Sequence, residues 1–548
     1  MQNHWKFLKQ EIAKHLDVGE NEIEEPKEFG DFAFPCFNLS KKMRKPPQEI
    51  AKELESEIKL PNMGVKAIGP YLNFYVKWEN FGNDFLKHVN EKYGFSNSLK
   101  NQEIMIEFSQ PNTNKPMHIG HMRNTALGDS LCHILKICGS KVIRANYYGD
   151  IGLHVAKTIL AYIKWGKNRK PNKKPDHFIG DFYTRFINME GKDKGLEEGA
   201  REILRKWEQD DKETIKLWKT LKNWCLKGFE ETYKNLNISF DVVFFESDFE
   251  RIGKDIAKRL LEKKIAFKSE TGEVVADLEK HGIPNCVILR SDGTSLYSTK
   301  DLALGMHKFE KYGIDKSIYV VGSEQNLYLR QVFKLLELLG YENAKNCYHL
   351  SYGLVMLPEG KMSSRRGYVV LLDDMLSILK KNVLKIMKKK NEKIAENVAV
   401  GALKYAMLKT SPENNISFNI EEVTRFDGDT GPYLQYTYAR ANSILKKSKV
   451  KTIKYDSRNL KEEKEILLLK LISLYPEIVE KAAKDYRPHY LANYFHNLAE
   501  TFNQFYQSIP VLKSDEKVRN ARLKLVESVK TILKNGLGLL GIPVVEKM

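Results

Sequence analysis

A four-residue turn, His118-Ile-Gly-His121, constrains the fold of this chain more than any other segment. It lies between a short apolar run ending at Phe108 and a stretch with apolar residues at helical spacing, which Gly139 closes. Residues 141–148 then have the pattern of a second strand. This order predicts a strand–helix–strand unit of a parallel sheet, with the turn at the edge where such sheets bind ligands. Because a helix N-terminus attracts phosphate and glycine lets a purine lie against bare backbone, the turn predicts a nucleotide-binding corner.

A second motif lies far downstream, just after the apolar stretch 350–357. A mobile lysine flanked by small hydroxyl residues can reach the phosphates of a nucleotide and neutralise charge that develops during phosphoryl chemistry. Read alone, the motif also suits a basic surface loop in a lysine-rich chain. A histidine turn after the first strand and a lysine loop after the last together favour one ATP site. The loop reads Lys361-Met362-Ser363-Ser364-Arg365.

In this order the two motifs resemble the signatures of the class I aminoacyl-tRNA synthetases. The resemblance implies a Rossmann-like catalytic domain in which His118, His121 and Lys361 act in catalysis. It also implies that ATP contacts these three residues, Gly120 and the rest of the loop 361–365. The loop departs from the class pattern, because it continues Ser-Ser-Arg-Arg and lacks the usual second lysine. Arg365 carries the charge there in a different geometry.

Length and composition are consistent with a large multidomain enzyme. At 548 residues the chain is too long for one hydrophobic core, and its formal charge of +18 favours a polyanionic partner. The six scattered cysteines form no Cys-x-x-Cys pair, so we expect neither a structural metal nor a disulfide framework. The polar N-terminus is no signal peptide, and no apolar run is long enough to span a bilayer. We therefore expect a cytoplasmic protein without a membrane partner.

The chain divides into three predicted parts. Residues 1–97 have the pattern of a small α/β domain. Residues 98–375 contain both motifs and strand signals, interrupted at about 164–240 by a charged, mostly helical insertion. Residues 376–548 form a run of helical patterns typical of a binding bundle. The predicted fold class is thus a multidomain α/β protein: a Rossmann-like catalytic domain with a helical insertion, a small N-terminal domain and an all-α C-terminal bundle.

Two aromatic clusters are candidates for RNA contacts. Phe32 and Phe34 lie near a basic run at 41–45, and Tyr433, Tyr436 and Arg440 lie close together in the bundle. Exposed aromatic rings stack on unpaired bases, and basic side chains contact the backbone. Each cluster is also typical of a purely structural arrangement, an aromatic core beneath a solvated charged face. On sequence alone, both readings stay open.

Three polar residues at the predicted sheet edge suggest the amino-acid substrate. Glu107 ends the first strand, Asp301 lies at the start of a helical segment, and Gln325 follows the strand 318–321. In a doubly wound sheet all three would face one crevice. Two carboxylates and an amide suit a planar cation with several N–H donors, such as guanidinium.

With these residues the resemblance narrows to the arginyl-tRNA synthetases and covers nearly the whole chain. It rests on the stretches 107–125, 297–301, 321–326, 427–440 and 540–548. By that match, Asn112 holds the α-amino end of arginine, whereas Glu107, Tyr297, Asp301 and Gln325 read its side chain. Ser109 and His118 are also implied to bind arginine. The N-terminal domain would grip the outer corner of the tRNA, and Phe32, Phe34, Tyr433, Tyr436 and Arg440 are the candidate tRNA contacts.

The implied activity is that of an arginine–tRNA ligase. Such an enzyme activates L-arginine with ATP and Mg²⁺ and then esterifies it to the terminal adenosine of tRNA(Arg), and we expect it to be a monomer. In this family arginine activation typically requires bound tRNA. Because the lysine loop is altered here, whether this chain has the same requirement stays open. Two alternatives remain: a nucleotidyltransferase that works without tRNA, and a non-catalytic tRNA-binding relative. The helical C-terminal part argues against the first, and the intact candidate site argues against the second.

Overall fold

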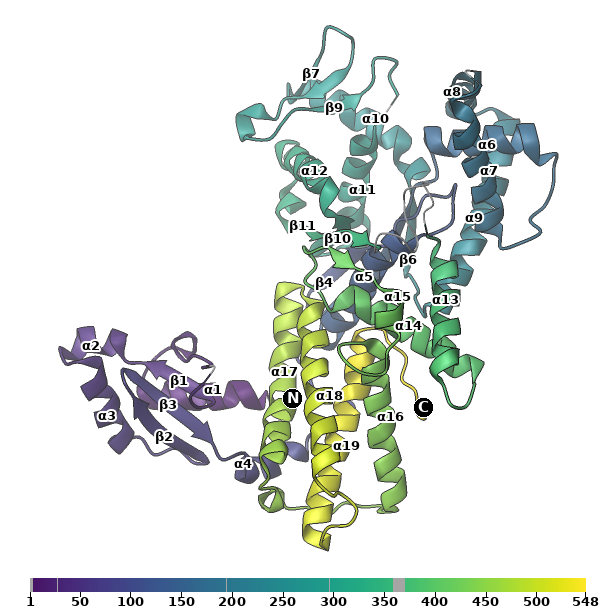
Figure 1. Ribbon diagram of the computed structural model, residues 1–548. Helices are drawn as coiled ribbons and strands as arrows, with labels where there is room; N and C mark the ends of the chain where they lie inside the picture. Colours follow the sequence, from purple (N-terminus) through teal and green to yellow (C-terminus); the bar gives the residue numbers. More distant parts are fainter. Residues whose placement is uncertain (1–2, 27, 194, 295, 358–369) are drawn as a thin grey trace. The chain divides into compact units, whose positions relative to one another are not determined.

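A computed structural model describes residues 3–26, 28–193, 195–294, 296–357 and 370–548 (Figure 1). The chain forms two compact units. The bundle unit comprises Met1–Ser98, Arg425–Leu539 and Pro543–Met548, and the sheet unit comprises Leu99–Thr424 and Leu540–Ile542. Lys361 and the rest of the predicted loop 361–365 lie outside the described residues.

A parallel five-stranded sheet is the centre of the sheet unit. Its strand order is β11-β10-β4-β5-β6, and every neighbouring pair is parallel. The chain builds β4, β5 and β6 in one direction, then returns to the other side of β4 for β10 and β11. The order therefore reverses between β4 and β10, which opens a crevice beyond their carboxyl ends. The strands are β4 (Glu103–Glu107), β5 (Lys141–Tyr148), β6 (Val242–Phe245), β10 (Lys316–Gly322) and β11 (Cys347–Tyr352).

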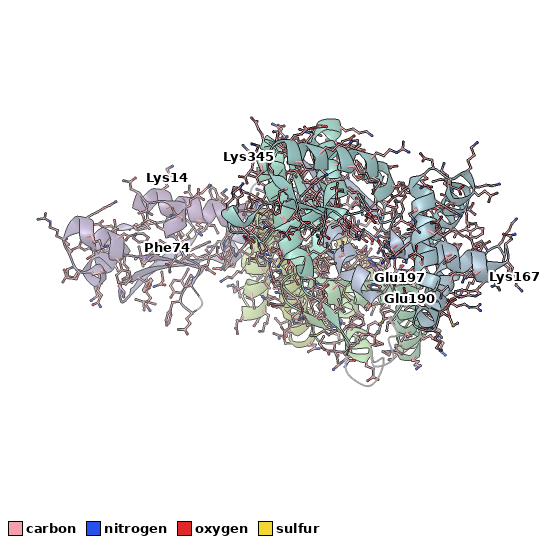
Figure 2. The ribbon with its side chains drawn as sticks, turned by 90° about the horizontal axis from the view of Figure 1, so that it is seen from above. Lys14, Phe74, Lys167, Glu190, Glu197 and Lys345 are labelled. Atoms are coloured by element: carbon pink, nitrogen blue, oxygen red, sulfur yellow. The ribbon has the colours of Figure 1, made fainter. Side chains whose placement is uncertain are left out.

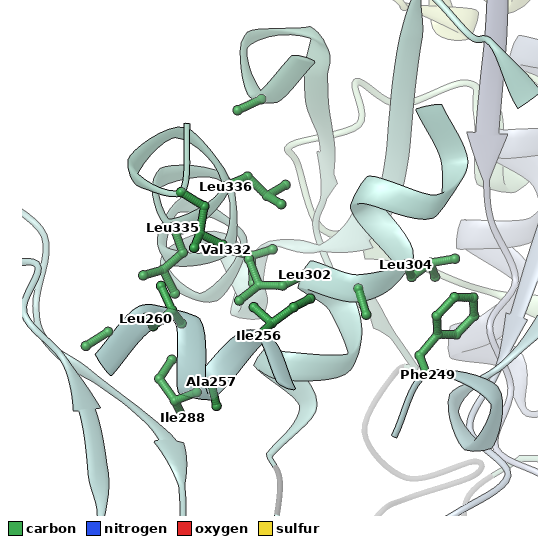
Figure 3. Close-up of a cluster of buried hydrophobic side chains, with 14 of the residues drawn as sticks. Phe249, Ile256, Ala257, Leu260, Ile288, Leu302, Leu304, Val332, Leu335 and Leu336 are labelled. Atoms are coloured by element: carbon green, nitrogen blue, oxygen red, sulfur yellow. The ribbon is translucent and has the colours of Figure 1, made fainter. Parts of the chain in front are cut away.

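Helical crossovers connect these strands, as the predicted Rossmann-like fold requires. Their apolar faces bury a continuous core in which Leu260, Leu302 and Leu335 come from three successive helices (Figure 3). A separate antiparallel sheet contains the segment 286–289, which pairs with β8 and not with the parallel sheet. The crossover helices are α5 (Ile119–Ile137), α10 (Glu246–Glu262), α11 (Tyr297–Tyr312) and α12 (Asn326–Leu338). The small sheet contains β7 (Ala266–Lys268), β8 (Val274–Ala276) and β9 (Cys286–Leu289).

The predicted insertion is helical. It packs around its own buried cluster, to which Phe178, Leu196 and Trp218 contribute. Charged side chains such as Lys167 and Glu197 lie on the outside of this region (Figure 2). The helices between β5 and β6 are α6 (Leu153–Gly166), α7 (Pro175–Glu190), α8 (Gly195–Glu208) and α9 (Lys212–Asn235).

The sheet unit extends past the boundary that we predicted near residue 375. Helix α14 packs against α5, and β12 pairs with β13, so the segment up to Thr424 shares the core of this unit. A helical pattern alone does not show on which neighbour a helix packs. The elements concerned are β12 (Val355–Met356), α13 (Leu372–Ile386), α14 (Glu392–Leu408), β13 (Ile416–Ser417) and α15 (Ile420–Val423).

The N-terminal part of the bundle unit is a small α/β module. Its antiparallel sheet has the order β1-β3-β2, and helix α3 packs on β2 and β3. Trp5 stacks on Trp78 at a centroid distance of 5.9 Å, which closes the aromatic core. Its elements are α1 (His4–Leu16), β1 (Phe32–Pro35), α2 (Phe37–Met43), α3 (Pro47–Glu57), β2 (Met63–Ile68), β3 (Tyr71–Val76) and α4 (Trp78–Leu86).

Four long helices form the rest of the bundle unit (Figure 1). Their facing sides bury leucine and aromatic residues, among them Leu468, Phe495 and Leu533. The helices are α16 (Gly431–Ser448), α17 (Glu463–Asp485), α18 (Pro488–Ser508) and α19 (Glu516–Leu539).

Candidate active site

The histidine turn lies at the predicted place, between β4 and α5. His118 is the N-cap of α5, and its Nδ1 accepts a hydrogen bond from the N–H of Gly120 at 3.2 Å. His121 Nδ1 accepts in turn from the N–H of His118 at 3.1 Å, which completes a capping box. The two ring centroids are 3.9 Å apart. A Cβ on Gly120 would lie 3.0 Å from the His118 ring, so glycine leaves room for that imidazole.

Both imidazoles are neutral at pH 7. Burial, together with the nearby ammonium group of Lys115, lowers the pKa of His118 to about 4. Burial and the His118 ring lower the pKa of His121 well below its usual range. Since each Nδ1 accepts a hydrogen bond, each neutral ring carries its proton on Nε2. The corner therefore presents two Nε2–H donors and one lysine, a set that suits phosphate oxygens.

The backbone of this corner is already paired. Ile119 N–H donates to the carbonyl of Val370 at 3.1 Å, and Leu372 N–H donates to the carbonyl of Met117 at 3.0 Å. The N–H of His121 bonds the His118 carbonyl at 2.9 Å. We expected the helix N-terminus itself to hold phosphate, but its first N–H groups have internal partners. The imidazole Nε2–H groups are therefore better placed than these backbone N–H groups to donate to a phosphate.

The predicted arginine-binding carboxylate Glu107 lies at the carboxyl end of β4 and is 3% exposed. It pairs with the ammonium group of Lys308, which is completely buried. Gln110 Nε2 donates to Glu107 Oε1 at 2.7 Å. The Lys308 Nζ also lies 3.8 Å from the centre of the Tyr319 ring. Sequence reasoning missed Lys308, because its apolar surroundings come from elements far apart in the chain.

Asp301 lies at the same crevice, in the first turns of α11. It accepts a hydrogen bond from the Tyr328 hydroxyl. Burial, with the Glu107 carboxylate adding to it, raises the pKa of Asp301 to about 6. Tyr297, the first residue of α11, is 50% exposed, and Lys300 Nζ lies 4.9 Å from its ring centre.

A third carboxylate, Glu246, was not predicted. It is the first residue of α10, directly after β6, and is 7% exposed. Lys300 Nζ pairs with it at 2.9 Å, yet burial still raises its pKa to about 7. The only sequence signal was an acidic residue at the end of a strand, which is as typical of an ordinary helix start.

Asn112 and Glu246 meet over Gly149. A Cβ on Gly149 would collide with the Asn112 side chain and lie 3.4 Å from Glu246 Oε1. Asn112 also forms an isolated parallel bridge with Gly149. The loop after β4 thus brings the residue predicted for the α-amino end beside Glu246.

Ser109 and Gln325 lie less directly in the crevice. Ser109 is buried, and its hydroxyl hydrogen-bonds Tyr233 at 2.7 Å and Thr125 at 3.0 Å, so it supports the loop. Its positive φ of 78° is held by Asn124, which accepts its N–H at 2.6 Å. Gln325 follows β10 as predicted, at the end of a 3₁₀ turn, and is exposed.

The pocket has a charge suited to a cation. The Asp301 carboxylate contributes to the raised pKa of Glu246, and the Glu107 carboxylate to that of Asp301. Lys300 pairs with Glu246, and Lys308 pairs with Glu107. When ionised, these three carboxylates outnumber the two ammonium groups, and the buried Glu250 also lies 3.8 Å from Lys300 Nζ. A guanidinium group supplies the matching positive charge and several directed donors.

The predicted RNA contacts in the N-terminal module need correction. Phe32 and Phe34 are completely buried on β1, so neither ring offers a face to a base. Exposed rings of this module include Phe37, at 47%, and Tyr71, at 36%, whose ring centroids are 5.8 Å apart in an edge contact. Alternation along a short strand marks a buried face but cannot identify which neighbouring rings stay outside.

The candidate contacts in the bundle lie on α16. Tyr436 and Arg440 border a cavity of about 660 Å³ that Tyr506 and Met548 also line. The Arg440 guanidinium lies 4.7 Å from the Tyr436 ring centre and 5.1 Å from that of Tyr506. Tyr433 is half-buried, and its ring centre is 6.1 Å from that of His496.

A family model described as "tRNA synthetases class I (R), catalytic domain" matches residues 85–420, more than half of the chain. The chain belongs to the arginyl-tRNA synthetase family. Two further models match, "Arginyl tRNA synthetase N terminal domain" at 6–76 and "DALR anticodon binding domain" at 434–548.

Relatives of the arginyl-tRNA synthetase family match along nearly the whole chain. The arginine–tRNA ligase of Treponema denticola is 41% identical over 552 residues, covering 95% of this chain and 93% of its own. That of Clostridium botulinum is 38% identical and covers 99% of both chains. The solved structure of Thermus thermophilus arginyl-tRNA synthetase superposes with a TM-score of 0.83 at 29% identity, over 99% of both chains.

These matches confirm the predicted family, fold class and ligase activity, and nothing favours the two alternatives. Membership of an aminoacyl-tRNA synthetase family implies ATP, an amino acid and tRNA as substrates. Among the described residues, no helix is long and apolar enough to cross a membrane.

Proposed function

We propose that this arginyl-tRNA synthetase binds ATP at the His118–His121 corner and L-arginine in the adjoining pocket of Glu107, Glu246 and Asp301. The observation that carries the proposal is the excess of buried carboxylates over ammonium groups at the reversal point of the sheet. Asn112 would hold the α-amino group, Tyr297 and Gln325 would complete the side-chain contacts, and Ser109 would support the loop.

The first step joins the arginine carboxylate to the α-phosphorus of ATP, and pyrophosphate leaves. His118 and His121 would donate their Nε2–H groups to the phosphates as charge builds there, so orientation and electrostatics supply the rate. The ammonium group of Lys115 lies close enough to lower the pKa of both imidazoles, and its charge would also attract the phosphates. Gly120 and the loop Lys361-Met362-Ser363-Ser364-Arg365 are proposed to complete the ATP contacts.

Magnesium would arrive with ATP. The described groups at the corner are N–H donors and a lysine, whereas Mg²⁺ prefers oxygen ligands, so the phosphates themselves would supply most of its coordination. When bound, the ion neutralises phosphate charge. No resident metal enters the proposal.

In the second step a ribose hydroxyl of the terminal adenosine of tRNA(Arg) attacks the arginyl carbonyl, and AMP leaves. We propose that the exposed pair Phe37 and Tyr71 and the cavity at Tyr436 and Arg440, with Tyr433 beside it, contact the tRNA. Because tRNA is its substrate, we expect the enzyme to work in the cytoplasm. We also propose that the enzyme acts as a monomer.

ATP–pyrophosphate exchange with each of the twenty amino acids, with and without tRNA(Arg), tests the proposal. Exchange that requires arginine, in either condition, supports it, and the comparison also shows whether tRNA is needed. Exchange without an amino acid, exchange with another amino acid, or none in either condition would overturn it.

A further inference from the structure

The insertion helix α9 has two adjacent buried polar residues, Thr232 and Tyr233, that the proposed reaction does not use. Tyr233 lies against the arginine side of the site. Its hydroxyl shares a hydrogen bond with Ser109 Oγ at 2.7 Å and accepts one from Asn146 Nδ2 at 3.0 Å. Helix α9 therefore contacts the loop that follows β4.

Asn146 continues this connection toward the pocket. Its Oδ1 accepts the backbone N–H of Gln110 at 3.0 Å, and Gln110 Nε2 donates to Glu107 Oε1 at 2.7 Å. Gln110 has a positive φ of 51°, a conformation that persists only where its surroundings hold it. Through Asn146, Tyr233 thus helps to hold the backbone that orients the side chains of Gln110 and Glu107.

Thr232 lies on the ATP side. Its hydroxyl accepts a hydrogen bond from Lys174 Nζ at 2.6 Å and lies 3.3 Å from Asp373 Oδ1. The other carboxylate oxygen of Asp373 pairs with Lys174 Nζ at 2.7 Å and with His177 Nε2 at 2.8 Å. Lys174 and His177 belong to the start of α7, so two insertion helices meet one carboxylate.

Asp373 lies in the first turn of α13, and the residues just before it frame the histidine turn. Val370 and Leu372 form the backbone hydrogen bonds to Ile119 and Met117 described above, on either side of His118. A shift of Asp373 therefore moves the wall of the ATP corner.

This group is a closed charge network rather than an open metal site. Asp176, His177 and Asp373 have donor atoms close enough to share an ion. The ammonium group of Lys174, however, already pairs with Asp176 at 3.1 Å and with Asp373 at 2.7 Å. A divalent cation would have to displace this lysine.

We propose that the insertion positions both substrate pockets through helix α9. Tyr233 is a positioning residue for arginine, and Asp373, held by Lys174, His177 and Thr232, is a positioning residue for ATP. The inference rests on the proposed function, because it takes ATP to lie at His118. It gives the insertion a role in catalysis without any contact to a reacting atom.

Steady-state ATP–pyrophosphate exchange on the full-length enzyme, with tRNA(Arg) present, tests this inference through separate KM values for ATP and arginine. Asp373→Asn should raise the KM for ATP by up to about 100-fold, the cost of a misplacement of about 1 Å, and change the KM for arginine less than about twofold. Tyr233→Phe should raise the KM for arginine and leave the KM for ATP unchanged. The matched control is Asp374→Asn, an exposed neighbour with the same charge change, which should behave as wild type.

Equal KM values for ATP in Asp373→Asn and Asp374→Asn would overturn the inference, as would a common rise in both KM values in either positioning variant. If Asp373→Asn lowers the unfolding midpoint, His177→Phe, which keeps a ring but removes the Nε2 contact with Asp373, replaces it with the same expected split. Failure of the proposed function is distinct, because wild-type enzyme would then show no arginine-dependent exchange.

Discussion

The ammonium group of Lys308 pairs with the carboxylate of Glu107 inside the sheet unit, where Lys308 is 0% and Glu107 3% exposed. Glu107 is thus a partly neutralised carboxylate before any substrate binds. Removing the two ions from water costs free energy of desolvation. The contact also fixes the orientation of Glu107 at the end of β4.

Replacing Lys308 tests how far the fold depends on this pair. Lys308→Met leaves a buried carboxylate without its counter-ion, so the free energy of unfolding should fall by about 3–5 kcal/mol. Urea denaturation followed by circular dichroism measures this loss. Lys311→Met, at an exposed position of the same helix, should change stability by about 0.5 kcal/mol or less. A Lys308 variant as stable as the Lys311 variant would contradict a structural role for the pair.

Contacts such as Lys308–Glu107 join residues that are far apart in the sequence, so a local sequence pattern does not predict them. The strand–helix–strand unit around the histidine turn is predicted correctly, since hydrophobic pattern and turn chemistry are local properties. Lys308 and Glu246 were missed, because their partners come from other strands and helices. Phe32 and Phe34 were predicted as RNA contacts, but a local pattern cannot distinguish an aromatic core from an exposed stacking surface.

The pH dependence of arginine binding should follow the two raised carboxyl pKa values. Glu246, at about 7, and Asp301, at about 6, are protonated below those values in the free enzyme, whereas guanidinium requires the ionised forms. Binding therefore releases protons, and affinity falls as the pH falls. Between pH 8 and pH 6 the KM for arginine should rise by roughly 10-fold or more. Calorimetry in buffers of different ionisation enthalpy counts the released protons; a KM independent of pH would exclude this coupling.

At the histidine turn, the effect of losing an Nε2–H donor can be measured separately from the effect of losing the helix cap. His121→Ala removes both the Nδ1 acceptor and the Nε2–H donor, and we expect adenylate formation to fall by about 10- to 1,000-fold. His121→Gln keeps an N–H donor near the position of Nε2 and should lose less. Single-turnover adenylate formation measures both. Unchanged pyrophosphate exchange in His121→Ala would remove this residue from the mechanism.

Phe37 and Phe34 offer a matched pair in the N-terminal module. Phe37→Ala removes an exposed ring that can stack on a base, so the KM for tRNA should rise by about 5- to 100-fold, as expected for one lost stack. Its unfolding should be unchanged. Phe34→Ala should instead destabilise the protein by about 3–5 kcal/mol, because it empties a fully buried position. Aminoacylation kinetics and urea denaturation, run on both variants, distinguish the two roles; a normal KM for tRNA in Phe37→Ala would exclude the stacking contact.

At the cavity on α16, the effect of positive charge on tRNA binding can be measured separately from the effect of the planar guanidinium group. Arg440 lies between the rings of Tyr436 and Tyr506 and donates to the Tyr436 hydroxyl at 3.0 Å, so its planar group organises that surface. Arg440→Lys keeps the charge but loses the planar contacts, and we expect the KM for tRNA to rise by about tenfold with an unchanged salt dependence. Lys447→Gln, at an exposed lysine that lines the same cavity, should instead lower the slope of log KM against log salt by about 0.7–0.9. Aminoacylation at several salt concentrations measures both. Equal salt slopes in the two variants would show that Lys447 contacts no phosphate, and a normal KM in Arg440→Lys would show that the cavity needs only charge.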